Sequence, residues 1–219
     1  MKICIDSGHG GTDPGCSGFG KNEKDLNLEY SMMLKNNLEC YENVTIIMTR
    51  IDDSGPDLET RAKLANDEKC DLFISCHLNA FNTKARGTEI IHSITSSSAW
   101  HSVCKSMGER IAQSLNIPFR KAYYKTGDRG IDYYSVIRNT NMEAIIVEAL
   151  FLDNKEDFNA YNPSKIADAI SSIIAEVNNL KKKEVLYKVI CGSFKDKTNA
   201  DKRVAALKEK GFDSFIINS

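Results

Sequence analysis

Four polar residues stand out because of their types and positions. His9 and His77 each follow a short apolar stretch, Glu23 opens a helical pattern, and Glu148 closes an apolar run. Two imidazoles and one carboxylate can hold zinc while leaving a fourth tetrahedral position open for water. A carboxylate at the end of a neighbouring strand could serve as general base. The residues therefore predict a hydrolytic site with one Zn²⁺ ion, bound by His9, Glu23 and His77, and with Glu148 as the catalytic residue.

The elements that must position these side chains alternate along the chain. Short apolar runs indicate strands, and apolar residues at spacings of three and four indicate helices. The predicted strands are 2–5, 44–48, 71–76, 88–92 and 144–147, and the predicted helices are 23–38, 57–68, 98–115 and 164–178. This order predicts an α/β fold with a mixed, mostly parallel sheet flanked by helices, a three-layer arrangement of the phosphorylase or hydrolase type.

Composition excludes several classes of partner. The chain has 29 basic and 30 acidic side chains and a net charge of −1, so it has no overall attraction to nucleic acid or to an anionic membrane surface. Neither a signal peptide nor a membrane-spanning stretch is evident in the sequence. The seven cysteines form no CxxC pair, which favours reduced thiols in the cytosol.

A polar and basic run interrupts the helical periodicity near the C-terminal end. We expect a linker at about 180–184, which divides the chain into a catalytic domain, 1–180, and a small unit, 184–219. The unit reads as a strand at 185–190, a helix at 200–207 and a strand at 212–217. A unit below roughly 40 residues rarely buries enough apolar surface alone, so we expect this one to dock or to pair with another copy.

Four ordered motifs, spread over residues 1–178, carry a family resemblance. They are Ile5 to Gly11, Asn22 to Leu28, Ser75 to Ala80 and Val147 to Asn154. The chain resembles the zinc-dependent N-acetylmuramoyl-L-alanine amidases of the Amidase_3 family. The resemblance implies peptidoglycan as the partner and zinc as the cofactor. The implied reaction is hydrolysis of the amide between N-acetylmuramic acid and the L-alanine of the stem peptide, which lyses the cell wall.

In that family the residues matching His9, Glu23 and His77 bind zinc, and the residue matching Glu148 is catalytic. The resemblance covers phage endolysins and bacterial autolysins without choosing between them. Together with the missing signal peptide, it suggests a protein that stays in the cytoplasm until lysis releases it.

Two other functions stay open at this stage. A zinc peptidase that cuts within the stem peptide would use the same ligands, and a non-catalytic peptidoglycan-binding protein would need no general base. Glu148 could also be a structural carboxylate paired with Arg129 or Arg138. Product analysis separates the peptidase from the amidase, and the intact Glu148 argues against the non-catalytic protein.

Several other residues have weaker signals. Arg129, in a loop near two tyrosines, and Asn79, in the third motif, are candidate substrate contacts, although Arg129 fits a solvated loop equally well. His92, His101 and Cys16 receive no functional role.

The C-terminal unit resembles the first half of a SPOR repeat, a family that binds peptidoglycan glycan strands. A complete SPOR domain is about twice as long, with two such halves in one sheet. We therefore expect two copies of the unit to pair between chains, which would give a homodimer.

Overall fold

The computed structural model describes residues 1–184 and 189–217. The chain divides into two compact units, Met1–Lys183 and Glu184–Ser219, and each is described by itself. The strands of the first unit are β1 (Lys2–Ser7), β2 (Ser17–Gly18), β3 (Lys21–Asn22), β4 (Thr45–Met48), β5 (Leu72–Asn79), β6 (Thr88–His92), β7 (Phe119–Tyr123) and β8 (Glu143–Phe151). Its helices are α1 (Glu23–Glu39), α2 (Leu58–Asp67), α3 (Ser98–Leu115), α4 (Ser135–Arg138), α5 (Lys155–Ala160) and α6 (Pro163–Val177), with a 3-10 turn at Asp128–Gly130.

The main sheet has six strands in the order β4-β1-β5-β8-β6-β7. The pairs β1–β4, β1–β5, β5–β8 and β6–β7 are parallel, whereas β6 and β8 are antiparallel. The predicted mixed, mostly parallel sheet is therefore confirmed. The small β2–β3 ribbon lies apart from it, just before α1.

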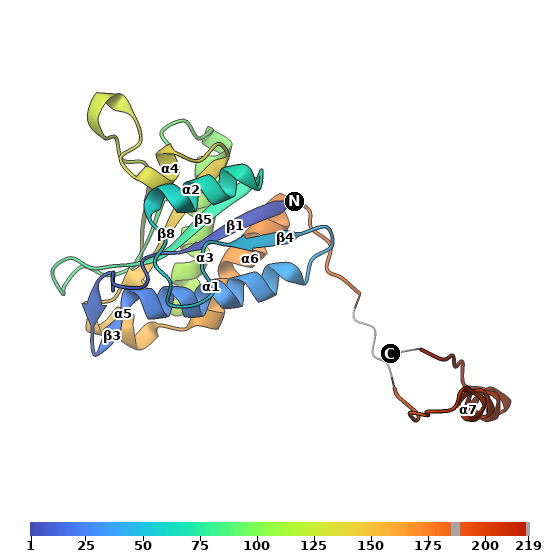
Figure 1. The fold of residues 1–219 in the computed structure, drawn as a ribbon. Helices are drawn as coiled ribbons and strands as arrows, with labels where there is room; N and C mark the ends of the chain where they lie inside the picture. The colour runs from blue at the N-terminus through green and yellow to red at the C-terminus, as the bar shows by residue number, and fades with distance from the viewer. Residues whose placement is uncertain (185–188, 218–219) are drawn as a thin grey trace. The chain divides into compact units, whose positions relative to one another are not determined.

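The two faces of the sheet pack against different helices (Figure 1). Side chains alternate along each strand, so the face that carries Ile74 and Val147 packs against α1, α3 and α6. The opposite face carries Phe73 and Ile146, which pack against residues of α2 and α4. The result is the predicted three-layer arrangement, with a core on each side of the sheet.

Two strands run further than the sequence analysis predicted. The prediction placed His77 and Glu148 at strand ends, but β5 continues to Asn79 and β8 to Phe151, so both side chains project from strand interiors. The pairing between β5 and β8 persists to the Asn79–Phe151 pair, past a register shift. Backbone pairing, rather than hydropathy, sets the ends of these strands.

The second unit contains one described helix, α7 (Lys197–Glu209), which overlaps the predicted helix. The strand predicted at 212–217 was wrong, because these residues form no strand in the structure. A strand needs a paired backbone, and no pairing is present here among the described residues. The strand predicted at 185–190 falls largely on residues 185–188, which lie outside the described residues. None of the described helices combines the length and the apolar character needed to cross a lipid bilayer.

Candidate metal centre and active site

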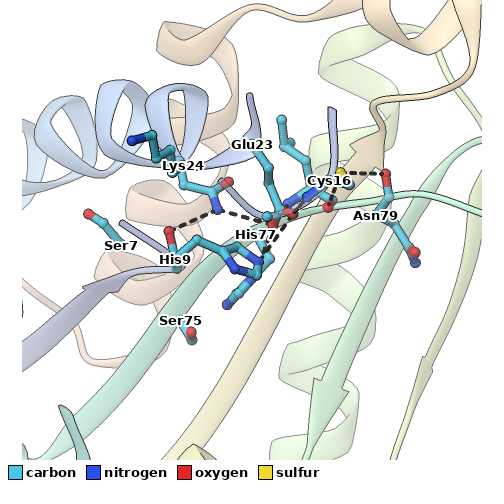
Figure 2. A network of polar contacts seen from close by, with 12 residues as sticks. Ser7, His9, Cys16, Glu23, Lys24, Ser75, His77 and Asn79 are labelled. Atoms are coloured by element: carbon cyan, nitrogen blue, oxygen red, sulfur yellow. Dashed lines mark hydrogen bonds and ion pairs between the residues drawn. The ribbon is translucent and has the colours of Figure 1, made fainter. Parts of the chain in front are cut away.

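Three elements bring the predicted ligands together (Figure 2). His9 lies in the turn after β1 with a left-handed φ of 62°, Glu23 is the first residue of α1, and His77 projects from β5. One donor atom from each side chain lies within 4.8 Å of the others. The two imidazole rings meet edge to face, with their centroids 4.9 Å apart. The structure therefore brings together residues that are far apart in the sequence; Glu23 and His77 are separated by 54 positions.

Glu23 is the centre of this cluster and is only 3% exposed. Its Oε1 lies 2.9 Å from His77 Nδ1, and its Oε2 lies 3.2 Å from His9 Nε2. The backbone N–H groups of Cys16 and Leu78 donate to the same carboxylate at 2.9 and 3.1 Å. Burial alone would raise the pKa of Glu23, but its contacts with the two histidines hold the pKa well below its usual range. Glu23 is thus an ionised carboxylate in a fixed orientation.

His9 is oriented by a second carboxylate. Its Nδ1 lies 2.8 Å from Asp13 Oδ2, so this nitrogen can carry the proton and leave Nε2 free to act as a ligand. Burial opposes protonation of His9, yet Glu23 and Asp13 raise its pKa to about 9 in the absence of a metal ion. A carboxylate behind a ligating imidazole is typical of protein metal sites.

The space around the ligands also fits a metal centre. A Cβ atom at Gly8 would lie 2.3 Å from the His77 ring, and one at Gly15 would lie 2.6 Å from Glu23 Oε2 and from His9 Cδ2. Only glycine permits such a close approach, and Gly15 also has a φ of +64°. The donor set and this tight enclosure fit one divalent ion of the zinc type.

Two buried arginines hold the turn that carries His9. Arg50 donates from Nε to the carbonyl of Ser7 at 2.9 Å and from a terminal nitrogen to that of Gly8 at 3.0 Å. Arg61 donates to the carbonyl of His9 at 2.7 Å and forms a 2.6 Å ion pair with Asp6. These contacts hold the left-handed His9 backbone in place.

Glu148 stands beside His77, since the two residues are in register on β8 and β5. Its Oε2 is buried and has no hydrogen-bond partner among the residues that the structure describes. Burial raises the pKa of Glu148 to about 7, with the charges of Glu23 and Glu89 acting in the same direction against His77. An unpartnered carboxylate with a pKa near neutrality can take up and release a proton.

The structure does not form the ion pairs that would give Glu148 a structural role. Arg138 donates to the backbone carbonyls of Asp132 and Tyr133, and Arg129 is exposed in the turn Asp128–Gly130. Asn79 lies nearer the centre, where its Nδ2 donates to Glu89 at 3.3 Å. Of the two candidate substrate contacts, only Asn79 forms a hydrogen bond with a residue next to Glu148, namely Glu89.

The residues without an assigned role have structural surroundings. Cys16 is half-buried with its Sγ 3.5 Å from the carbonyl of Leu78, and burial raises the pKa of its thiol above the usual range. A thiol in this state is a poor nucleophile. His92 and His101 contact each other at 2.8 Å, and His92 is the last residue of β6.

Sequence reasoning missed the roles of Asp13, Arg50, Arg61 and Glu89. Asp13 follows His9 by four residues, which was the one local signal available. The other three act through contacts between segments that lie far apart in the sequence. Their residue types alone gave no indication of their partners.

Comparisons with known proteins agree with this geometry. Residues 3–179 match the Amidase_3 family, described as N-acetylmuramoyl-L-alanine amidase, and residues 167–218 match the SPOR domain family. The second match begins inside α6, which packs in the first unit.

Individual relatives give the same result. The chain is 33% identical to the N-acetylmuramoyl-L-alanine amidase CwlM of Bacillus licheniformis, over 99% of this chain and 85% of that protein. It is 34% identical to the endolysin of Bacillus phage SPP1, over 83% of this chain and 67% of the endolysin. The crystal structure of an N-acetylmuramoyl-L-alanine amidase from Clostridium difficile 630 superposes with a TM-score of 0.73 at 26% identity, covering 81% of this chain and 96% of that one. The chain therefore belongs to the Amidase_3 family of N-acetylmuramoyl-L-alanine amidases, enzymes that hydrolyse peptidoglycan.

Proposed function

We propose that the chain cleaves the amide between the lactyl group of N-acetylmuramic acid and the L-alanine of the stem peptide. In this proposal His9, Glu23 and His77 bind one zinc ion, and Glu148 is the general base. The observation that carries the proposal is the unpartnered, buried Oε2 of Glu148 directly beside His77. A carboxylate kept without a partner next to a metal centre fits a group that exchanges protons with water and substrate.

The chemistry divides between the ion and the chain. When bound, a zinc ion polarises the amide carbonyl and lowers the pKa of a nearby water. Glu148 removes a proton from the attacking water as the water oxygen bonds to the carbonyl carbon. Glu148 then gives that proton to the amide nitrogen as the carbon–nitrogen bond breaks, so the products are a carboxylic acid and a free amine.

The surrounding residues keep the ligands in their required states. Glu23 stays ionised because the histidines and two backbone N–H groups stabilise its charge. Asp13 holds the proton of His9 on Nδ1 and so presents the lone pair of Nε2 to the ion.

Two residues are proposed to contact the substrate. Asn79 sits at the end of β5, two residues beyond His77, where it could meet the stem peptide. Arg129 is exposed in the turn Asp128–Gly130, and peptide carboxylates are the partners that its guanidinium would favour.

We propose that residues 1–180 form the catalytic domain and that residues 184–219 bind the cell wall or pair with a second copy. No residue of α7 is buried. The second unit also exposes a set of large apolar side chains, namely Val189, Ile190, Phe194, Phe212, Phe215, Ile216 and Ile217. Such a surface favours a partner. The test compares the oligomeric state in solution of the full chain and of a chain truncated after residue 183. If both are monomers, pairing through this unit is refuted.

We further propose that the protein stays in a reducing compartment, the cytoplasm, until lysis gives it access to the wall. All seven cysteines are free, including the buried Cys4, Cys76 and Cys104. Free thiols in this number are typical of a reducing compartment. Comparison of the thiol content before and after release would test the proposal.

The decisive experiment uses the full chain and purified peptidoglycan. Wild type, Glu148→Ala and chelator-treated wild type are incubated with the polymer, and new stem-peptide N-termini are identified by mass spectrometry. We expect free L-alanine amines from wild type alone, and recovery of the chelated sample with zinc. New termini at another stem residue would indicate a peptidase, and no release by the zinc-loaded wild type would indicate a binding protein.

A further inference from the structure

Three polar side chains lie in one row across the sheet. His77 on β5 is in register with Glu148 on β8, and Glu148 is in register with Glu89 on β6. Residues opposite one another on neighbouring strands project from the same face, so the two carboxylates are direct neighbours. Like charges in such positions destabilise a sheet, and Glu89 is only 5% exposed. The fold must therefore compensate the charge of Glu89.

The compensation comes from the next strand. Arg120 Nε donates to Glu89 Oε1 at 2.7 Å, and Lys121 Nζ lies 3.9 Å from the same oxygen. On the other side, Glu89 Oε2 accepts from Asn79 Nδ2 at 3.3 Å. Glu89 is thus surrounded by donors, whereas the Oε2 of its neighbour Glu148 has none.

A β-bulge brings two consecutive cations to one carboxylate. Thr88 pairs with Phe119, but Glu89 pairs with Lys121, so Arg120 is an extra residue in β7. In a regular strand, Arg120 and Lys121 would project from opposite faces. The bulge turns the Arg120 side chain toward Glu89, and bulges of this kind often redirect a side chain next to an active site.

We propose that Glu89 is a positioning residue that captures Arg120 and thereby keeps Glu148 free of an ion pair. Neighbouring strands are about 4.8 Å apart, so a guanidinium released from Glu89 would lie one strand from Glu148 and within reach of it. An Arg120–Glu148 pair would occupy the carboxylate oxygens that must accept the proton of water. The inference rests on the proposed role of Glu148 as general base.

The test is a rescue experiment on the full, zinc-loaded chain with purified peptidoglycan as substrate. Glu89→Gln keeps the shape of the side chain and removes the charge that holds Arg120. We expect kcat to fall at least about tenfold with little change in KM, because general-base catalysis contributes roughly 10²–10⁴ to the rate. The double variant Glu89→Gln/Arg120→Gln should recover to within about threefold of wild type, since neighbouring sites that share a partner are not additive.

A matched control separates local pairing from overall charge. Glu89→Gln/Lys125→Gln removes a nearby positive charge whose Nζ lies over the Tyr133 ring at 3.7 Å and which has no contact with Glu89. This double variant should stay as slow as Glu89→Gln alone. Metal content and thermal unfolding are measured for every variant, so loss of zinc or of the fold is detected independently of activity.

Two results would overturn the inference. One is a Glu89→Gln/Arg120→Gln variant no faster than Glu89→Gln, because a purely structural role predicts that losses accumulate. The other is equal recovery with Lys125→Gln. If Glu89→Gln does not fold, Glu89→Asp withdraws the carboxylate from Arg120 by one methylene, and the same rescue by Arg120→Gln is required. An inactive wild type would refute the proposed function itself, which distinguishes the two failures.

Discussion

Gly15 makes the steric requirements of the metal centre testable. A Cβ atom there would lie 2.6 Å from both Glu23 Oε2 and His9 Cδ2, whereas real Cβ contacts essentially never fall below 3.0 Å. In a Gly15→Ala variant, ligand-bearing side chains must therefore move by at least the difference, 3.0 − 2.6 = 0.4 Å. Glu23 cannot move freely, because backbone N–H groups and both histidines hold its carboxylate.

This displacement exceeds what a metal site tolerates. Ligand distances must stay within roughly 0.2 Å of their ideal values. Disturbing the shell around a site typically costs 10–100-fold in affinity, or about 1.4–2.7 kcal/mol. We therefore expect the zinc dissociation constant of Gly15→Ala to rise by about that factor.

Gly20 supplies the matched control. Its φ of +78° is also left-handed, but among the described residues no atom beyond Gly20 and its two chain neighbours lies within 4 Å of the position that a Cβ would take. Alanine in this conformation costs about 1–2 kcal/mol of backbone strain at either position, so Gly20→Ala measures the strain alone, and Gly15→Ala adds the clash with Glu23 and His9. Only Gly15→Ala should lose zinc affinity. Competition with a chromophoric chelator measures the affinity, and urea denaturation measures the stability.

Two outcomes would refute this reasoning. Wild-type affinity in Gly15→Ala would mean that the ligands adjust without cost. An equal loss of affinity in Gly20→Ala would mean that backbone strain, rather than contact with Glu23 and His9, controls the site.

Three further predictions concern other parts of the fold. Asp13→Ala removes the partner of His9 Nδ1 and should weaken zinc binding about tenfold, while the unfolding midpoint of the metal-free protein stays nearly unchanged because Asp13 is exposed. Arg61→Met leaves Asp6 buried without its ion-pair partner, and urea denaturation should show a loss of about 3–5 kcal/mol; a loss below 1 kcal/mol would contradict it. Burial raises the pKa of the Cys104 thiol to about 12, so above about pH 9 the folded protein holds a proton that the unfolded chain releases. Stability should therefore fall as the pH rises, by about 1.4 kcal/mol per pH unit from this group, and Cys104→Ala should remove that part of the slope.

The candidate metal ligands could be selected from the sequence because each has a local signal. His9 follows the apolar core of β1 after a short polar turn, His77 comes directly after the apolar core of β5, and Glu23 begins the periodic pattern of α1. The parallel order of the sheet then brings β1 and β5 together as neighbours. Periodicity and residue type together were enough to predict the α/β layers and the donor set.

Contacts between distant segments were not predictable in this way. The strand β7 was missed because Arg120 and Lys121 interrupt its apolar pattern, and the bulge that places them depends on pairing with β6. The extension of β8 beyond Glu148 likewise depends on its pairing partners, since residue type alone suggested an end. In β7 hydrogen bonding to a neighbour overrides the local hydropathy, whereas the residues of β8 beyond Glu148 are themselves apolar and buried.

The three candidate ligands differ in the contacts that hold them in place. Glu23 and His77 belong to a helix and a strand whose positions are fixed by the packing of the core. His9 lies in neither, and its left-handed backbone is held by hydrogen bonds from Arg50 and Arg61 to the surrounding carbonyls. Because Arg61 also pairs with Asp6, the ligand that depends least on apolar packing depends most on a buried charge network. Substitutions in that network should therefore weaken metal binding through His9 while leaving Glu23 and His77 in place.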